Sequence, residues 1–224
     1  MEAKKREKHF WVPFFDEAGV FLLLSSSVVS KPLEIEILDC EGRKKNTIKL
    51  QLSSSSNIEV LPIEPLANGC IREGGLLHSH LVVKADEDIS FFAKPYSIIN
   101  RCKAVPLHCS SFGSLNKKSA VVPLYLSEKK RHCIGFANPL EKETVLSLRL
   151  SIGKRLPLEQ IKVPANGSRA IVVEAAFEEV IKEENLKAPV YLKMEAENQL
   201  ITGGITVASN QEKREEMVSN FFSV

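Results

Sequence analysis

The sequence predicts an all-β protein of two tandem antiparallel β-sandwich units, Ig-like or jelly-roll-like, that pack on each other as a pseudo-dimer. Three observations predict this fold class. Apolar and polar residues alternate with a period of two in several short segments, as in strands that bury one face. Turn-forming residues separate these segments. One pattern of strands and turns also occurs twice within the 224 residues.

The clearest alternation lies in two segments. In "LEIEIL", residues 33–38, the apolar side chains of Leu33, Ile35 and Ile37 share one face and two glutamates share the other. In "VLSLRLSI", residues 145–152, four apolar residues alternate in the same way with Ser and Arg. Successive side chains of a strand point to opposite faces, so both segments are expected to be strands with one buried face.

An internal repeat relates these two segments. A first constant offset aligns Leu33 with Leu146 and also aligns Ile48 with Ile161. Further along, a second and slightly shorter offset aligns "LVVKADEDIS", which begins at Leu81, with "LKMEAENQLI" in the second half of the chain. One register that spans several strands and turns predicts a tandem duplication of one all-β unit.

The repeat sets the expected domain boundaries. Residues 1–96 form unit 1, residues 97–119 form a linker or crossover, and residues 120–207 form unit 2. Within unit 2, the helical spacing of apolar residues after Glu174 predicts a short helix that ends before Pro189. The tail, residues 208–224, is charged and then apolar, which predicts an amphipathic helix that docks on the body or, as the alternative, on a partner.

Composition narrows the class of function. Hydrophobic residues make up 44% of the chain, and the formal net charge is +2, which does not predict nucleic-acid binding. No apolar run is long enough to span a bilayer, and Pro13 and Asp16 interrupt the only candidate for a signal peptide. We therefore expect a cytoplasmic protein whose five cysteines are reduced thiols.

The sharpest chemical candidate is the pair His78 and His80 in "GGLLHSHLVVK". Residues two apart in a strand share a face, so both imidazoles are able to approach one metal ion. The second offset of the repeat places His80 on Tyr191, in a strand whose other face carries the apolar residues. We therefore expect His78 and His80 on the outer face of unit 1, where they meet solvent or another subunit. A metal-dependent β-barrel enzyme that uses this pair is the alternative.

Two further groups of residues are candidate sites. Cys102, His108, Cys109, His132 and Cys133 contain no paired-cysteine knuckle, and Cys133 is expected to be a small core residue. Four aromatic residues are candidates for binding a ligand or partner: Trp11, Tyr191, Phe221 and Phe222. For Trp11, a place in the core contribution of the first strand is the competing interpretation.

The layout of unit 2 carries a family resemblance. A strand ends in Asn138-Pro139, and a turn at Pro164-Ala165 is followed by Arg169 and another strand, a short acidic helix and two final strands. Over most of unit 2 this layout resembles the sensory rhodopsin transducer family of small β-sandwich proteins, and unit 1 shares it through the repeat. The resemblance implies a non-enzymatic cytoplasmic adaptor that oligomerises and binds proteins or small ligands.

The leading functional hypothesis is therefore a non-enzymatic binding or adaptor protein that needs no cofactor. The chain contains no phosphate-binding loop, dinucleotide glycine motif or nucleophile elbow. A third hypothesis is a structural protein that self-associates through strand edges and its apolar tail.

Overall fold

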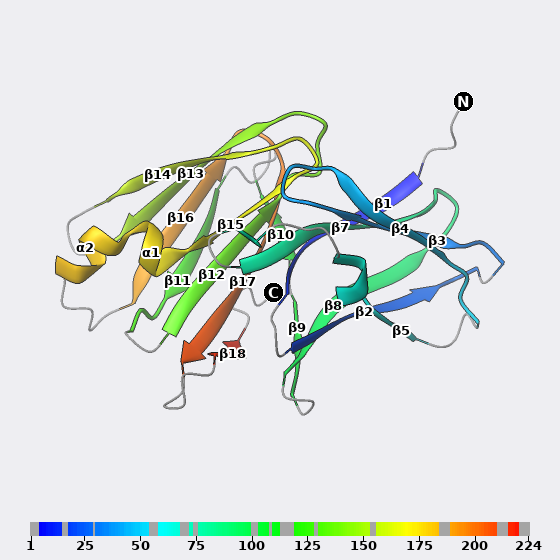
Figure 1. Cartoon of the computed structure of the whole chain (residues 1–224). Helices are drawn as coiled ribbons and strands as arrows, with labels where there is room; N and C mark the ends of the chain where they lie inside the picture. Colours follow the sequence, from blue (N-terminus) through cyan, green and yellow to red (C-terminus); the bar gives the residue numbers. More distant parts are fainter. Residues whose placement is uncertain are drawn as a thin grey trace.

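The computed structural model describes residues 5–14, 18–28, 30–53, 58–67, 72–73, 76–99, 103–107, 109–112, 119–127, 130–152, 156–183, 189–209 and 215–219. The protein is all-β, as predicted: four antiparallel sheets form two lobes that lie side by side, and two short helices lie at the far end of the second lobe (Figure 1). In the part of the chain that is described, no helix has the length and apolar character that crossing a membrane requires.

The first sandwich consists of sheet 1, with the strand order β1-β7-β3-β4, and sheet 2, with the order β5-β2-β8-β9. Sheet 1 contains β1 (Lys5–Phe14), β3 (Leu33–Leu38), β4 (Lys44–Leu50), β7 (Leu76–Asp86) and the short β6 (Arg72–Glu73), which pairs with β7. Sheet 2 contains β2 (Ala18–Ser26), β5 (Glu59–Pro62), β8 (Phe91–Ile99) and β9 (Lys103–Pro106). A 3-10 helix, η1 (Glu64–Ala67), follows β5.

The second sandwich consists of sheet 3, with the order β10-β17-β12-β15, and sheet 4, with the order β11-β16-β13-β14. Sheet 3 contains β10 (Cys109–Phe112), β12 (Lys130–Ala137), β15 (Ser168–Val172), β17 (Leu200–Ser209) and β18 (Glu215–Ser219), which pairs with β17. Sheet 4 contains β11 (Ser119–Leu124), β13 (Thr144–Ser151), β14 (Leu158–Val163) and β16 (Val190–Ala196). The predicted short helix is present as α1 (Val173–Ala176) and α2 (Glu178–Glu183).

The two sandwiches share one topology. Sheet 4 repeats the strand order of sheet 1, and the strands β15, β12, β17 and β18 repeat the pairing of β5, β2, β8 and β9. Ile35 pairs with Val83 in the first sandwich, and Leu148 pairs with Met194 in the second. The two offsets of the sequence repeat align these same positions. The strand pairing therefore agrees with a tandem duplication.

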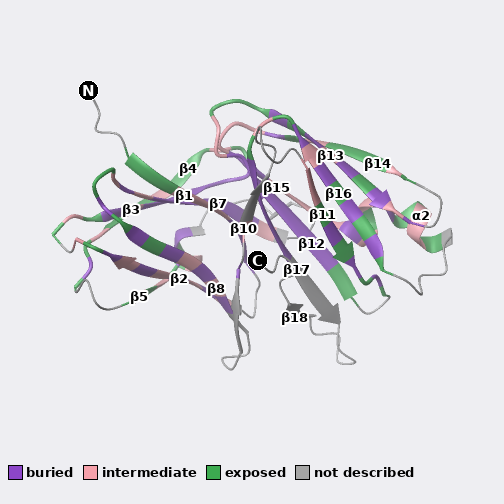
Figure 2. Cartoon of the chain, turned by 180° about the vertical axis from the view of Figure 1, so that it is seen from behind, coloured by how far each residue is buried: buried purple, intermediate pink, exposed green. Residues whose placement is uncertain are grey.

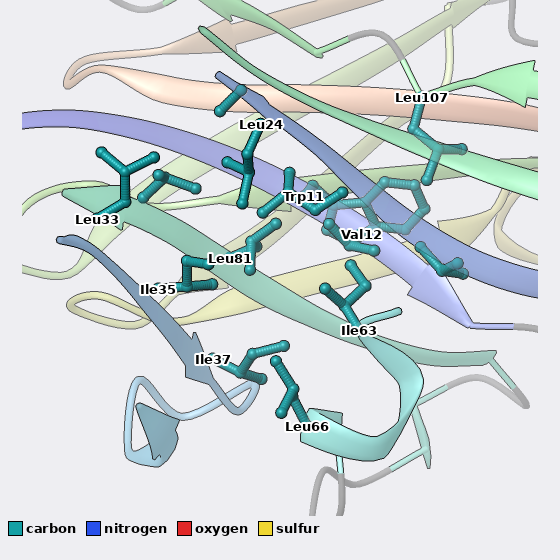
Figure 3. Close-up of a cluster of buried hydrophobic side chains, with 14 of the residues drawn as sticks. Trp11, Val12, Leu24, Leu33, Ile35, Ile37, Ile63, Leu66, Leu81 and Leu107 are labelled. Carbon is teal, nitrogen blue, oxygen red and sulfur yellow. The ribbon is translucent and has the colours of Figure 1, made fainter. Parts of the chain in front are cut away.

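Each sandwich buries its own core between its two sheets. The inner residues of β2, β3 and β7 form the first core, shown in Figure 3 with Leu24, Ile35 and Leu81 converging. The second core includes Phe136, Leu148 and Met194. Buried and exposed residues alternate along β16, as the sequence pattern predicted (Figure 2). Cores of this kind supply most of the stabilisation of a sandwich.

Two segments depart from the predicted secondary structure. The segment 97–119, expected to be a linker or crossover, contributes the end of β8 and also β9, which pairs with β8, and β10, which pairs with β17. The tail, expected to be helical, contributes β18. The physical reason is the same in both places, since the open edges of β8 and β17 offer backbone hydrogen bonds and a short isolated helix is marginally stable.

The sandwiches pack through non-equivalent sheets. Strand β1 contacts β12 and β17, and β7 contacts β15, so the outer face of sheet 1 lies on the outer face of sheet 3. The layers therefore follow the order sheet 2, sheet 1, sheet 3, sheet 4. Sheet 1 corresponds by topology to sheet 4 and not to sheet 3. The joint is thus head-to-tail, in contrast to a two-fold pseudo-dimer, which would join equivalent faces.

Candidate functional site

The joint between the sandwiches is built around Trp11. Its side chain is 1% exposed and points away from the first core, because it pairs with His80 on the outer face of sheet 1. The indole ring lies against Gly135 of β12, where an added Cβ would come within 1.6 Å of a ring carbon. Glycine at position 135 is therefore the only residue that admits the indole ring at this distance.

The two predicted histidines lie in the same joint. His78 and His80 occupy the face of β7 opposite to Leu81 and Val83, so the predicted face is correct. The expected environment is wrong, because both side chains are 0% exposed and are covered by the second sandwich of the same chain. His78 Nδ1 lies 3.1 Å from Ser168 Oγ, and His80 Nδ1 lies 2.8 Å from the backbone oxygen of Asn166.

A third histidine, His9, extends this contact into a chain of hydrogen bonds. The carbonyl oxygen of Asn166 only accepts, so Nδ1 of His80 carries a proton and donates it. The Nε2 atom of a neutral His80 then accepts a hydrogen bond from His9 Nδ1 at 3.0 Å. His9 Nε2 lies 3.2 Å from a carboxylate oxygen of Glu7, at the rim of the joint.

Burial sets the protonation of both rings. It lowers the pKa of His80 from 6.5 to about 3, and the hydrogen bond to Asn166 only partly opposes this effect. Burial also lowers the pKa of His9, against the attraction of the Glu7 carboxylate. His80 is therefore neutral at physiological pH, and an added proton is accepted best at the Glu7 end of the chain.

Beyond the histidines, the same face of sheet 1 carries a charged network. Lys84 lies 2.9 Å from Glu36 and 3.3 Å from Glu7, and Lys44 also pairs with Glu36. Burial alone would raise the pKa of the Glu36 carboxyl, but the two lysines hold it below its ordinary value. The outer face of sheet 1 thus changes from a covered, neutral half to a charged half.

Two turns lock the joint at its edge. The backbone nitrogen of Ser168 donates to the oxygen of Cys40, and the Arg169 guanidinium donates to the same oxygen at 3.0 Å and to Glu41 at 2.9 Å. Gly42 has a φ of +78°, and a Cβ there would lie 2.1 Å from the oxygen of Ala165. Ala165 and Arg169, two of the residues that carry the family resemblance, therefore help to hold the sandwiches together.

Asn138 supports the second of these turns from within its own sandwich. Its side-chain nitrogen donates to the backbone oxygens of Lys142, Val163 and Pro164, and its side-chain oxygen accepts from Leu140. The backbone nitrogen of Asn138 also donates to the oxygen of Gly167. The Asn-Pro strand end and the "VPANGS" turn thus form one hydrogen-bonded unit.

Of the other residues that were candidates for metal binding, the structure describes Cys109, His132 and Cys133. Within the described ranges, no three His, Cys, Asp or Glu side chains are grouped so as to hold a metal ion. His132 contacts Glu174 at 2.5 Å in the second sandwich, and Cys133 is buried on the opposite face of β12, in the joint. Cys102 and His108 lie outside the described residues. A metal at His78 and His80 stays a prediction.

The four aromatic candidates have different positions. Trp11 is buried in the joint, so its predicted role in binding an external ligand or partner is wrong; the second sandwich occupies its ring. Tyr191 is 50% exposed on the outer face of sheet 4. Phe221 and Phe222 lie outside the described residues. Of the two that the structure describes, Tyr191 is the one that an external partner is able to reach.

Sequence reasoning missed an apolar surface on the outer face of sheet 2. Phe21 pairs with Pro62 and Tyr96, and Leu23 pairs with Val60 and Lys94. All of these side chains point away from the core, and Phe92, 42% exposed, extends the surface along β8. The signal was present in "AGVFLLLSS", where consecutive apolar residues fill both faces of β2. We call Phe21, Leu23, Val60, Pro62, Phe92 and Tyr96 the sheet 2 surface.

Comparisons with known proteins do not assign this chain to a family. A scan against protein-family models finds no match, and a search of curated proteins finds none at a significant level. The resemblance to the sensory rhodopsin transducer family stays a prediction.

Proposed function

We propose that this protein is a non-enzymatic binding protein whose partner protein docks on the sheet 2 surface. The observation that carries the proposal is the gathering of six apolar side chains from β2, β5 and β8 on one face. Two charged groups adjoin this face: Lys94 lies 5.6 Å from the Tyr96 ring centre, and the Glu64 carboxylate lies beside Gly19, next to the Phe21 ring. Contiguous exposed apolar faces are typical of interaction sites.

The second sandwich supports the proposal with an internal precedent. The topologically equivalent outer face of sheet 3 is covered by a protein surface, namely sheet 1 of the same chain. Its apolar residues include Cys133, Ala137 and Ile201, all buried. A face of this type therefore already accepts a β-sheet face in this protein, and the sheet 2 surface is its uncovered counterpart.

The same proposal includes a cytoplasmic location. Cys109 of β10 carries a thiol that forms no disulfide, and burial raises its pKa. Reduced cysteines are typical of proteins in the cytoplasm.

Site-specific photo-cross-linking in the native host tests the proposal. A photoreactive phenylalanine analogue replaces Phe92 on the sheet 2 surface, and a control chain carries it at Gln51, an exposed residue after β4. The expected result is a discrete cross-linked protein from position 92 that is missing from position 51. Absence of any product specific to position 92 would contradict the proposal.

A further inference from the structure

We propose that the partner on the sheet 2 surface is a second copy of this chain, which docks through the outer face of its sheet 4. The inference rests on the proposed binding function and names its partner. Its starting point is the head-to-tail joint inside the chain, where the outer face of sheet 1 covers the outer face of sheet 3. Sheets 4 and 2 are the topological equivalents of these two faces, and each carries exposed apolar side chains among the described residues.

The exposed apolar residues concentrate on these two end sheets. Among the residues whose burial is described, nine large hydrophobic side chains are exposed, and none belongs to sheet 1 or sheet 3. Ile58, Val60 and Phe92 lie in or beside strands of sheet 2, and Val121, Tyr125, Val145, Leu156, Leu158 and Tyr191 lie in or beside strands of sheet 4. The apolar surface left over by folding is thus at the two ends of the stack of layers.

The outer face of sheet 4 is suited to receive the sheet 2 surface. Tyr191 lies between Pro123 and Ser151 on neighbouring strands, and Lys193 lies between Val121 and Arg149. The charges of this face are paired locally, since Glu195 lies 2.6 Å from Lys193 and 3.9 Å from Arg149. Lys162, on the same face, lies 3.7 Å from Glu143, so these cations each have an acidic partner, which lowers the cost of removing them from water on docking.

The internal joint shows how a large side chain of one face fits a small residue of the other. There, the large ring of Trp11 lies over Gly135, in a strand that also presents Cys133 and Ala137. At the ends, the large rings of Phe21, Phe92 and Tyr96 belong to sheet 2. The small side chains Ser147 and Ser151 belong to sheet 4. On sheet 4 these serines flank Arg149, and Tyr191 lies beside Ser151, so the rings of the sheet 2 surface would fill the two small positions between larger side chains.

A head-to-tail contact has a consequence that a two-fold contact lacks. Each copy uses its sheet 4 face on one neighbour and its sheet 2 surface on another, so association continues beyond a dimer into a ring or an open filament. A variant with one face blocked is still able to bind a second chain through its other face. Two differently blocked chains therefore pair once and stop.

Sedimentation velocity of the purified full chain across micromolar concentrations tests the inference. Phe92→Lys blocks the sheet 2 surface, Tyr191→Lys blocks the sheet 4 face, and Gln51→Lys adds the same charge at an exposed residue outside both. We expect the average mass of the unaltered chain to rise with concentration beyond that of a dimer, and the Gln51→Lys variant to behave in the same way. Each blocked variant loses association by about 30-fold or more, as for a central hot-spot residue. A mixture of the two blocked variants forms a one-to-one dimer.

Several outcomes would overturn the inference. The inference fails if the unaltered chain remains monomeric. It also fails if association stops at a dimer and mixing the two blocked variants does not restore it. If the chain is monomeric while position 92 cross-links to a different protein, this inference fails and the proposed binding function stands. Trp11 fluorescence of each variant checks that the joint, and with it the fold, is intact.

Discussion

Acid should weaken the joint between the sandwiches through one buried side chain, His80. Its Nδ1–H donates to Asn166 and its Nε2 accepts from His9, so the neutral ring satisfies both contacts. Protonation places a charge in a site that is 0% exposed and makes Nε2 a second donor. The groups that face it are His9 and Glu7 on β1, Lys84 on its own strand and Glu36 on β3.

The size of the effect follows from proton linkage. The unfolded imidazole titrates at 6.5, whereas burial holds the pKa of the folded ring at about 3. Between these values the unfolded chain binds the proton and the folded chain does not, so stability falls as the pH drops below 6.5. At pH 5 the unfolded ring is about 97% protonated and the folded ring about 1%, which lowers the free energy of unfolding by about 2 kcal/mol relative to pH 7.5.

Urea unfolding at pH 7.5 and pH 5 measures this loss, with the fluorescence of Trp11, the single tryptophan, reporting on the joint. His80→Asn retains a donor near Asn166 and removes the titrating ring, so the unaltered chain should lose about 2 kcal/mol more than this variant. Nitrogen NMR of the folded chain should find His80 as the neutral Nδ1–H tautomer at pH 5. Equal losses in both chains, or a protonated His80 at pH 5, would refute the reasoning.

Three further predictions address the joint. Gly135→Ala should lower the free energy of unfolding, measured in urea, by about 3 kcal/mol, because the new Cβ meets the Trp11 ring; this is the upper range for overpacking. Adding Trp11→Leu to the same chain should restore part of the loss. In the same assay, Arg169→Met should lower the free energy of unfolding by about 1 to 2 kcal/mol, because the hydrogen bond to Cys40 is lost. Glu41→Gln should lower it by less than about 1 kcal/mol, because its contact with Arg169 lies at the surface. A larger loss for Glu41→Gln than for Arg169→Met would contradict the assigned contacts. Burial raises the pKa of the Cys109 thiol to about 12, so peptide mapping after alkylation at pH 8 should find it modified far more slowly in the folded than in the urea-unfolded chain. Equal rates would contradict its burial.

The sequence predicted correctly those features that depend on the residue pattern within one strand. The alternation in "LEIEIL" and "VLSLRLSI" predicted β3 and β13 and their buried residues, since a period of two directly encodes the two faces of a strand. The repeat predicted that His78 and His80 point away from the core of their own sandwich, and they do. Offsets between repeats also aligned residues that pair equivalently, as Ile35 with Val83 and Leu148 with Met194.

The sequence pattern of a single strand does not predict which surface covers its outer face. The hydrogen-bond partners of His78 and His80 lie far along the chain, in a turn of the other sandwich. A face that carries His, Lys and Glu is typical of a solvated surface, and half of this one is solvated. The choice of which half is covered depends on Gly135 and Gly42, whose missing side chains allow close contact. Neither glycine stands out in the linear sequence.

The joint combines apolar contacts with buried hydrogen bonds, whereas the two end faces expose apolar side chains, and this difference has a physical rationale. The two sandwiches belong to one chain, so their effective concentration is high and the joint needs little driving force of its own. A joint of this kind is able to use hydrogen bonds that fix orientation, as His78 and His80 do, although such bonds contribute little net stability. Contact between separate chains must overcome the loss of translational and rotational freedom, which requires buried apolar area. The sheet 2 surface and the outer face of sheet 4 around Tyr191 offer such area.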